Sequence, residues 1–66
     1  MNTFQKNIKE LRVGLGLTQK ELAHALGVLE RTVSYWEKGR SECDFDMLIK
    51  IANFFDVSID ELLTGK

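Results

Sequence analysis

Apolar residues recur along the chain at the spacing of short amphipathic helices. The first stripe contains Phe4, Ile8, Leu11 and Leu15. Side chains three or four residues apart share one face of a helix, so this segment is predicted to be helical with that face buried. Thr3 is placed to cap its start, and Gly14 and Gly16 are expected to end it. No segment shows the sustained alternation of apolar and polar residues that predicts a strand.

Two further helices are predicted in the middle of the chain, joined by a very short connection. Thr18 and Glu21 have the spacing of a capping box, in which each side chain accepts a hydrogen bond from the other residue's backbone N–H. Gly27 is expected to end the second helix, and Gly39 the third. The residues expected to point inward are Leu22, Ala23, Leu26, Leu29, Val33 and Trp36. Because Gly27 and Val28 alone cannot turn the chain into antiparallel packing, the helices must cross steeply, as in a helix-turn-helix.

The remainder of the chain predicts two more helices. Asp44 is placed to cap the fourth helix. The expected inner stripe of that helix is Phe45, Leu48, Ala52 and Phe55. Ser58 and Glu61 form a second capping box, which opens a short fifth helix with Leu62 and Leu63 on its inner side. The predicted fold class is therefore a compact all-α domain of five helices.

Composition limits how such a small domain can be stabilised. Residues 1–66 are expected to form one domain with one core, and a domain of this size is stable by a narrow margin. Cys43 is the only cysteine, so an internal disulfide is excluded, and Cys43 with His24 cannot complete a four-ligand zinc site. Close helix packing, a partner copy, or both remain as sources of stability. No metal or other cofactor is expected, and a lone thiol without a signal or membrane segment indicates a cytoplasmic protein.

The net charge of −1 is unevenly divided along the chain. Residues 1–40 contain seven basic and four acidic side chains, whereas residues 41–66 contain two basic and six acidic ones. A polyanion such as nucleic acid would therefore meet the first two-thirds of the domain, with the acidic remainder turned away. An ordinary mixed surface explains the same charges equally well.

The third helix separates into an inward and an outward face when its residues are projected at about 100° each. Arg31, Ser34 and Tyr35 project outward, opposite to the predicted inward stripe, and Glu30 lies on their flank. An exposed face of this composition offers hydrogen-bonding groups that suit the edges of DNA bases.

Five spaced motifs stand in order along the chain: residues 17–23 (LTQKELA), 26–28 (LGV), 32–39 (TVSYWEKG), 48–52 (LIKIA) and 57–63 (VSIDELL). Together they resemble the lambda-repressor-like (Cro/C1, or XRE) helix-turn-helix family, over almost the whole chain. The resemblance implies a transcriptional regulator with the helix-turn-helix at its second and third helices and the third helix in the major groove of DNA.

The resemblance also implies roles for individual residues. Base-reading positions of the family match Glu30, Arg31 and Tyr35, with Ser34 beside them. The candidate phosphate contacts are Gln19, Lys20, Lys38 and Arg40. Arginine can bridge O6 and N7 of guanine, and glutamate can accept a hydrogen bond from N4 of cytosine. A solvated surface position is the alternative for each of the base-reading residues and for Lys20.

Two positions of the motif concern how the third helix is held. The family pairs an arginine with a glutamate at the positions of Arg12 and Glu37, so an ion pair between the first and third helices is expected, with a phosphate contact of Arg12 as a secondary role. Leu29 departs from the family, which usually has a Ser or Thr cap there, and a missing cap costs about 1 kcal/mol. Leu29 either adds to the core or contacts DNA itself.

Self-association is suggested by apolar residues outside the predicted core. Met47 and Phe54 lie far round the fourth helix from its inner stripe. One interpretation is a two-fold homodimer interface on the fourth and fifth helices, anchored by Phe54 and Leu63. The other is that the fifth helix covers these residues within one chain. A two-fold dimer would place its recognition helices about 34 Å apart and bind a near-palindrome.

The function expected from these features is sequence-specific binding of double-stranded DNA by a transcriptional regulator, as a repressor. An enzyme is not predicted, because the sequence offers no nucleophile with a neighbouring base and no metal cluster. The alternative is a protein-interaction or antitoxin-type module of the same fold, with a toxin or other protein partner and weak or no DNA reading.

Overall fold

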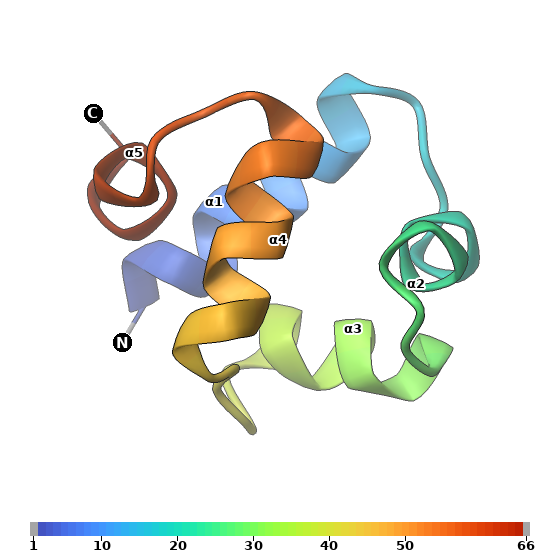
Figure 1. The fold of residues 1–66 in the computed structure, drawn as a ribbon. Helices are drawn as coiled ribbons and strands as arrows, with labels where there is room; N and C mark the ends of the chain where they lie inside the picture. Colours follow the sequence, from blue (N-terminus) through green and yellow to red (C-terminus); the bar gives the residue numbers. More distant parts are fainter. Residues whose placement is uncertain (1, 66) are drawn as a thin grey trace.

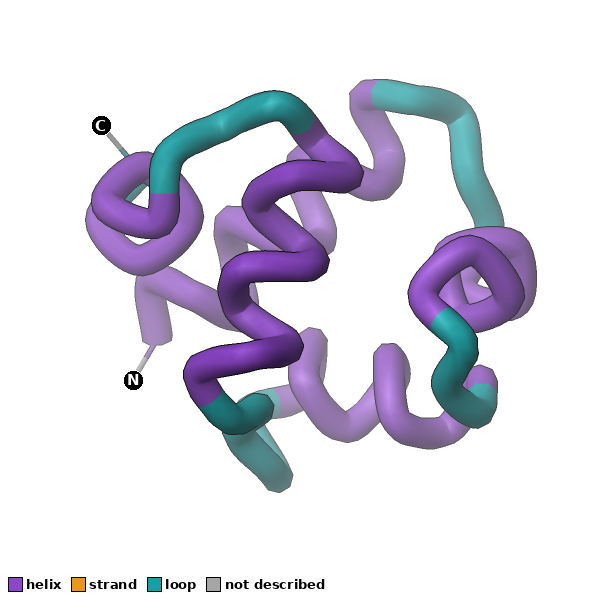
Figure 2. Tube along the Cα trace, viewed as in Figure 1, coloured by secondary structure: helices purple, strands orange, loops and turns teal. Residues whose placement is uncertain are grey.

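The computed structural model describes residues 2–65, which fold into five helices (Figure 1). The helices are α1 (Asn2–Gly14), α2 (Gln19–Leu26), α3 (Glu30–Lys38), α4 (Phe45–Phe55) and α5 (Ile59–Thr64). Loops and turns join them, and the described residues contain no strand (Figure 2). The Cα atoms span 26 × 23 × 21 Å along the principal axes. The all-α, five-helix fold class expected from the sequence is confirmed.

Side-chain caps and glycines place most helix ends where the sequence predicts them. At the start of α2, the Thr18 hydroxyl accepts a hydrogen bond from the Glu21 N–H at 3.0 Å, and the Glu21 carboxylate accepts one from the Thr18 N–H at 2.8 Å. The capping box that opens α5 makes the same two bonds. Asp44 caps α4 through its carboxylate. Gly27 and Gly39 end α2 and α3 with φ of 75° and 73°, a left-handed conformation that side chains disfavour.

Two expectations for α1 are wrong. Thr3 lies inside the helix and does not cap it, because α1 already begins at Asn2. Leu15 is 58% exposed, although it was expected on the buried face with Leu11. The helix ends at Gly14, so Leu15 lies in the following turn, where the helical spacing no longer directs its side chain.

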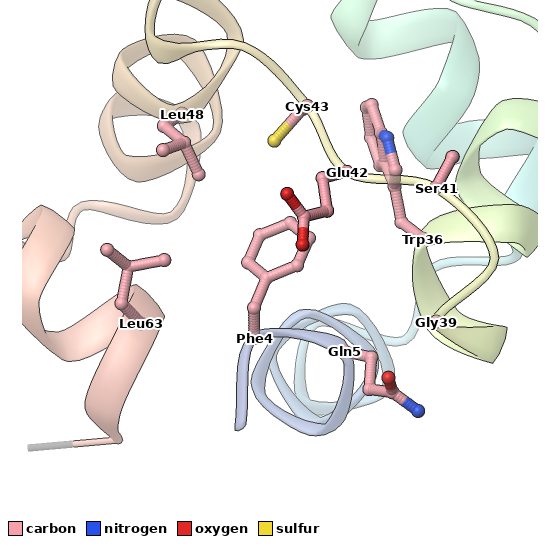
Figure 3. Close-up of a pocket in the computed structure, with 9 residues that line it drawn as sticks. All are labelled: Phe4, Gln5, Trp36, Gly39, Ser41, Glu42, Cys43, Leu48 and Leu63. Carbon is pink, nitrogen blue, oxygen red and sulfur yellow. The ribbon is translucent and has the colours of Figure 1, made fainter. Parts of the chain in front are cut away.

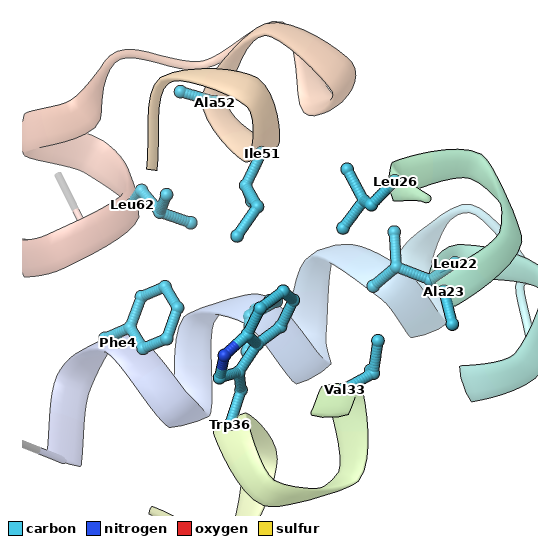
Figure 4. Close-up of a cluster of buried hydrophobic side chains, with 10 residues drawn as sticks. Phe4, Leu22, Ala23, Leu26, Val33, Trp36, Ile51, Ala52 and Leu62 are labelled. Atoms are coloured by element: carbon cyan, nitrogen blue, oxygen red, sulfur yellow. The ribbon is translucent and has the colours of Figure 1, made fainter. Parts of the chain in front are cut away.

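One apolar core joins all five helices (Figure 4). Its buried members are Phe4, Ile8, Leu22, Ala23, Leu26, Val33, Trp36, Ile51, Ala52 and Leu62. In Figure 4, the Trp36 ring extends from α3 into the centre of this cluster, toward Ile51 of α4. Helix α3 is therefore part of the core on one face, which fixes the direction of its opposite face.

The structure corrects the predicted inner faces of α3 and α4. Ile51 is fully buried, so the inner face of α4 centres on this residue. Phe45 lies about 120° round the helix from Ile51, and it is 64% exposed although it was expected to point inward. Leu29 was also expected to point inward and is 60% exposed. It precedes α3 with an extended backbone (φ −79°, ψ 150°), so the helical projection does not apply to it.

Hydrogen bonds from side chains to helix C-termini fix how the helices are arranged. Lys50 of α4 donates through Nζ to the Leu26 carbonyl at the end of α2, at 2.7 Å. Asn7 of α1 donates through Nδ2 to the Leu62 carbonyl of α5, at 2.9 Å. Figure 1 views α2 nearly along its axis while α3 runs across the page, so the two helices cross steeply. This crossing is the one expected for a helix-turn-helix.

The uncapped start of α3 predicts that Leu29→Ser stabilises the fold. Leu29 is the N-cap residue and makes no side-chain hydrogen bond to the helix, so a serine hydroxyl can accept from a free N–H there. We expect a gain of about 1 kcal/mol in the free energy of unfolding, or about 4–8 °C in Tm. Urea and thermal unfolding measure both. Leu15→Ser is the control, because Leu15 is equally apolar and similarly exposed but caps no helix. An equal change in both variants would contradict the capping argument.

Candidate nucleic-acid interface

The outward face of α3 is open to solvent along its whole length. Glu30 and Arg31 are exposed in its first turn, Tyr35 is 41% exposed one turn later, and Ser34 between them is half-buried. Leu29 extends this exposed surface by one residue beyond the helix start. The side chains expected to read bases therefore share one accessible helix face, and Leu29 adjoins it and adds nothing to the core.

A partly buried ion pair holds α3 against α1. Arg12 Nε lies 2.7 Å from Glu37 Oε2, and Arg12 Nη2 lies 3.1 Å from Glu37 Oε1, so the contact is bidentate. The Arg12 side chain is 12% exposed and that of Glu37 is 4% exposed. The hydrogen bond to Glu37 raises the pKa of Arg12, against the lowering effect of its burial. The structure thus has an ion pair at the positions where the sequence analysis expects one, and Arg12 is engaged inside the fold.

The remaining bonds of this pair connect it to α2. Arg12 Nη1 donates to the Leu17 carbonyl at 2.8 Å, just before α2 begins. Gln19, the first residue of α2, donates through Nε2 to Glu37 Oε1 at 3.0 Å. Glu37 therefore accepts hydrogen bonds from both α1 and α2 while belonging to α3. These contacts fix the start of α2 relative to α3, and this role of Gln19 was not predicted from the sequence.

Three exposed basic side chains lie near the ends of α2 and α3. Lys20 is exposed in the first turn of α2, next to Gln19. Lys38 is exposed at the last residue of α3, and Arg40 is exposed just beyond Gly39. The Arg40 N–H donates to the Tyr35 carbonyl at 2.9 Å, which holds the segment after α3 close to the helix end. Exposed basic side chains therefore stand at the start of α2 and at the end of α3.

Lys50 is a positioning residue that sequence reasoning missed. Its ammonium group caps the C-terminus of α2 and lies 3.6 Å from the position that a Cβ at Gly27 would occupy. The turn of the helix-turn-helix is therefore supported from α4. In the sequence, Lys50 stands out only as a charged residue among apolar neighbours in the fourth helix. That position does not identify the carbonyl group to which it donates.

Of the three residues considered for a dimer interface, Met47 and Phe54 share one flank of α4, and Leu63 lies elsewhere. Met47 and Leu63 are half-buried and pack against the core, whereas Phe54 is 39% exposed. Leu63 lines a pocket together with Leu48 (Figure 3). Phe54 and Leu48 lie about 120° apart on α4, so Phe54 occupies a different flank of α4 from the one that Leu63 adjoins.

Other kinds of site are not found in the part of the chain that the structure describes. Residues 2–65 contain no group of three or more His, Cys, Asp or Glu side chains placed to hold a metal ion. Among the same residues, no helix is long and apolar enough to cross a membrane.

Comparison with known proteins shows one consistent relationship. The Helix-turn-helix family model matches residues 8–62. The HTH-type transcriptional activator BcrR of Enterococcus faecalis is 41% identical over 63 residues, which cover 96% of this chain and 31% of BcrR. A transcriptional regulator from Listeria innocua has a solved structure with a TM-score of 0.87 and 38% identity, covering 96% of this chain and 58% of that one. The P22 c2 repressor in complex with a synthetic operator gives a TM-score of 0.90 at 26% identity, with both chains fully covered.

The length of the match differs between relatives. The chain spans between 31% and 54% of the first three curated relatives. The chain therefore corresponds to only part of the length of those relatives.

The ion-pair network predicts that Glu37→Gln is destabilising. The substitution leaves the guanidinium of Arg12, which is 12% exposed, without a compensating charge. We expect a loss of about 3 kcal/mol in the free energy of unfolding, measured by urea denaturation. The matched control is the double variant Arg12→Met/Glu37→Leu, which removes both charges and should lose less stability than the single variant. A double variant that is less stable than Glu37→Gln would show that the unpaired charge is not the cause.

Proposed function

Since this chain belongs to the Helix-turn-helix family, we propose that it is a sequence-specific transcriptional regulator that binds double-stranded DNA. The observation that supports this most strongly is the exposed face of α3, which is directed away from the core by buried Val33 and Trp36. In this architecture the second helix of the motif enters the major groove with its first residues at the base edges. In this proposal the protein is not an enzyme and acts by occupying its binding site on DNA.

The residues of the interface divide into two roles. Glu30, Arg31, Ser34 and Tyr35 face the base edges. Gln19, Lys20, Lys38 and Arg40 contact phosphates. Arg31 bridges O6 and N7 of a guanine, and Glu30 accepts from N4 of a cytosine, which offsets its repulsion by the phosphates. Gln19 reaches the backbone with the one Nε2 proton that its bond to Glu37 leaves free. Base contacts supply the choice of sequence, and phosphate contacts supply register and most of the affinity.

A two-fold homodimer is part of this proposal. Such a dimer places two α3 helices about 34 Å apart, one turn of duplex, and recognises a near-palindromic operator. Met47, Phe54 and Leu63 are the apolar candidates for contact on α4 and α5. Occupancy of an operator that overlaps a promoter makes the protein a repressor, and the site of action is the cytoplasm.

The general test is selection of bound sequences from a random pool of duplexes at near-physiological salt. Recovery of a common sequence, arranged as an inverted repeat, supports both the DNA-binding function and the dimer. Failure to enrich any sequence, together with no salt-dependent affinity for duplex DNA, would contradict the proposal. That result would favour a protein-interaction or antitoxin-type module of the same fold.

Arg31→Ala is expected to weaken binding to the selected duplex by about 1–3 kcal/mol and to relax the preference at one base pair. The physical reason is that the variant loses the bidentate contact with guanine. The fold is expected to be unaffected, because the Arg31 side chain is exposed. Competition binding with duplexes changed at each position measures both effects. An unchanged preference at every base pair would remove Arg31 from the reading face.

Lys38→Ala is expected to weaken binding to all duplexes alike. An exposed ammonium at the end of α3 contacts a phosphate, so its removal lowers the dependence of log affinity on log salt concentration by about one. Titrations at several salt concentrations, on the selected and on a scrambled duplex, measure the change. If Lys38→Ala altered base preference as Arg31→Ala does, the division into reading and phosphate-contacting residues would be wrong.

A further inference from the structure

Leu29 is an exposed apolar residue at the edge of the outward face of α3. Its side chain is 60% exposed, and it stands directly before Glu30, the first residue of the helix. It is the N-cap residue of α3, but its side chain makes no hydrogen bond to the helix. Within residues 2–65, Leu29 therefore contributes neither to the core nor to the capping of α3.

The backbone around Leu29 fixes the direction of its side chain. The Val28 N–H donates to the Ala23 carbonyl at 2.9 Å, and the Thr32 N–H donates to the Leu29 carbonyl at 2.9 Å. The Val28 side chain packs against the core. Leu29 has an extended backbone (φ −79°, ψ 150°), in which successive side chains point in opposite directions. The Leu29 side chain is therefore held away from the core, on the surface that adjoins Glu30 and Arg31.

The edges of DNA bases offer one apolar group that a leucine can recognise. In the major groove each base pair presents hydrogen-bond donors and acceptors, and thymine adds its C5-methyl group. A leucine side chain has no donor or acceptor, so its favourable partner in the groove is this methyl group. Against a base edge without the methyl, the leucine would cover polar groups and leave them without hydrogen bonds. An apolar side chain at this position therefore favours thymine.

The short distance along the chain from Leu29 to Arg31 limits where that thymine lies. Two residues of extended chain span at most about 7 Å, and successive nucleotides of a duplex strand are about 3.4 Å apart along the axis. In this architecture the first residues of the second helix of the motif are at the base edges. The thymine is therefore expected within about two base pairs of the guanine that Arg31 bridges.

We propose that Leu29 contacts the C5-methyl group of a thymine and is a further specificity-determining residue of this chain. The proposal rests on the proposed function, and it adds one apolar contact to the polar contacts of Glu30 and Arg31. It also accounts for the uncapped start of α3. A serine at this position would cap the helix but would remove the apolar surface that recognises the methyl group.

The test replaces single thymines by uracil, which lacks only the C5-methyl group, in the duplex recovered by selection. With the unaltered chain, uracil at the contacted position should raise the Kd about fourfold, the effect of losing the burial of one methyl-sized group. With Leu29→Ala, the same replacement should change the Kd by less than about 1.5-fold. Leu29→Met keeps an apolar side chain of similar volume and should keep most of the discrimination.

Two variants separate recognition of the methyl group from effects on folding. Leu29→Ser should lose the discrimination between thymine and uracil although it is expected to stabilise the fold, so unfolding does not explain that result. Leu15→Ala is the matched control, because Leu15 is 58% exposed and lies in the turn after α1, outside the helix-turn-helix. This variant should retain the full difference between thymine and uracil.

Two results would overturn the role of Leu29 and leave the proposed function intact. One is a selected sequence with no thymine within about two base pairs of the guanine identified with Arg31→Ala. The other is a uracil effect of equal size for the unaltered chain and for Leu29→Ala, at every thymine of the duplex. Failure to select any sequence would contradict both the role of Leu29 and the proposed function.

Discussion

The position of the recognition helix depends on one partly buried charge, the carboxylate of Glu37. It accepts two hydrogen bonds from Arg12 of α1 and one from Gln19 of α2, while its own backbone belongs to α3. The pair is costly to desolvate, so its value lies less in stability than in geometry. A charged group with this little exposure tolerates few alternative arrangements, and the three helices that surround it are therefore fixed relative to one another. Val33 and Trp36 form the buried face of α3, and this determines which face of the helix remains outside.

Local features of this fold could be predicted from the sequence, because their causes are local. The capping boxes at Thr18 and Ser58 and the left-handed glycine at Gly27 depend on residues within one turn of each other. The outward face of α3 followed from helical periodicity alone. The pairing of Arg12 with Glu37 spans 25 positions, and only the resemblance to a known family suggested it.

The errors fall where tertiary packing or an element boundary decides. Leu15 and Leu29 lie just outside helices, so the periodic spacing wrongly predicted that their side chains are buried on a helix face. In α4 the stripe through Phe45 and the one through Ile51 are both consistent with the spacing, and only the placement of neighbouring helices selects Ile51. The bond from Lys50 to the Leu26 carbonyl is likewise invisible without the crossing of α4 over the end of α2.

The central claim is that the outward face of α3 lies in the major groove, and protection of guanine N7 from methylation by dimethyl sulfate tests it most directly. N7 is exposed in the major groove and is an acceptor for arginine. On the duplex obtained by selection, we expect protected guanines in each half-site, one of which regains reactivity when Arg31 is replaced by alanine. Unaltered N7 reactivity throughout the bound duplex, or the same protection with and without the Arg31 side chain, would contradict it.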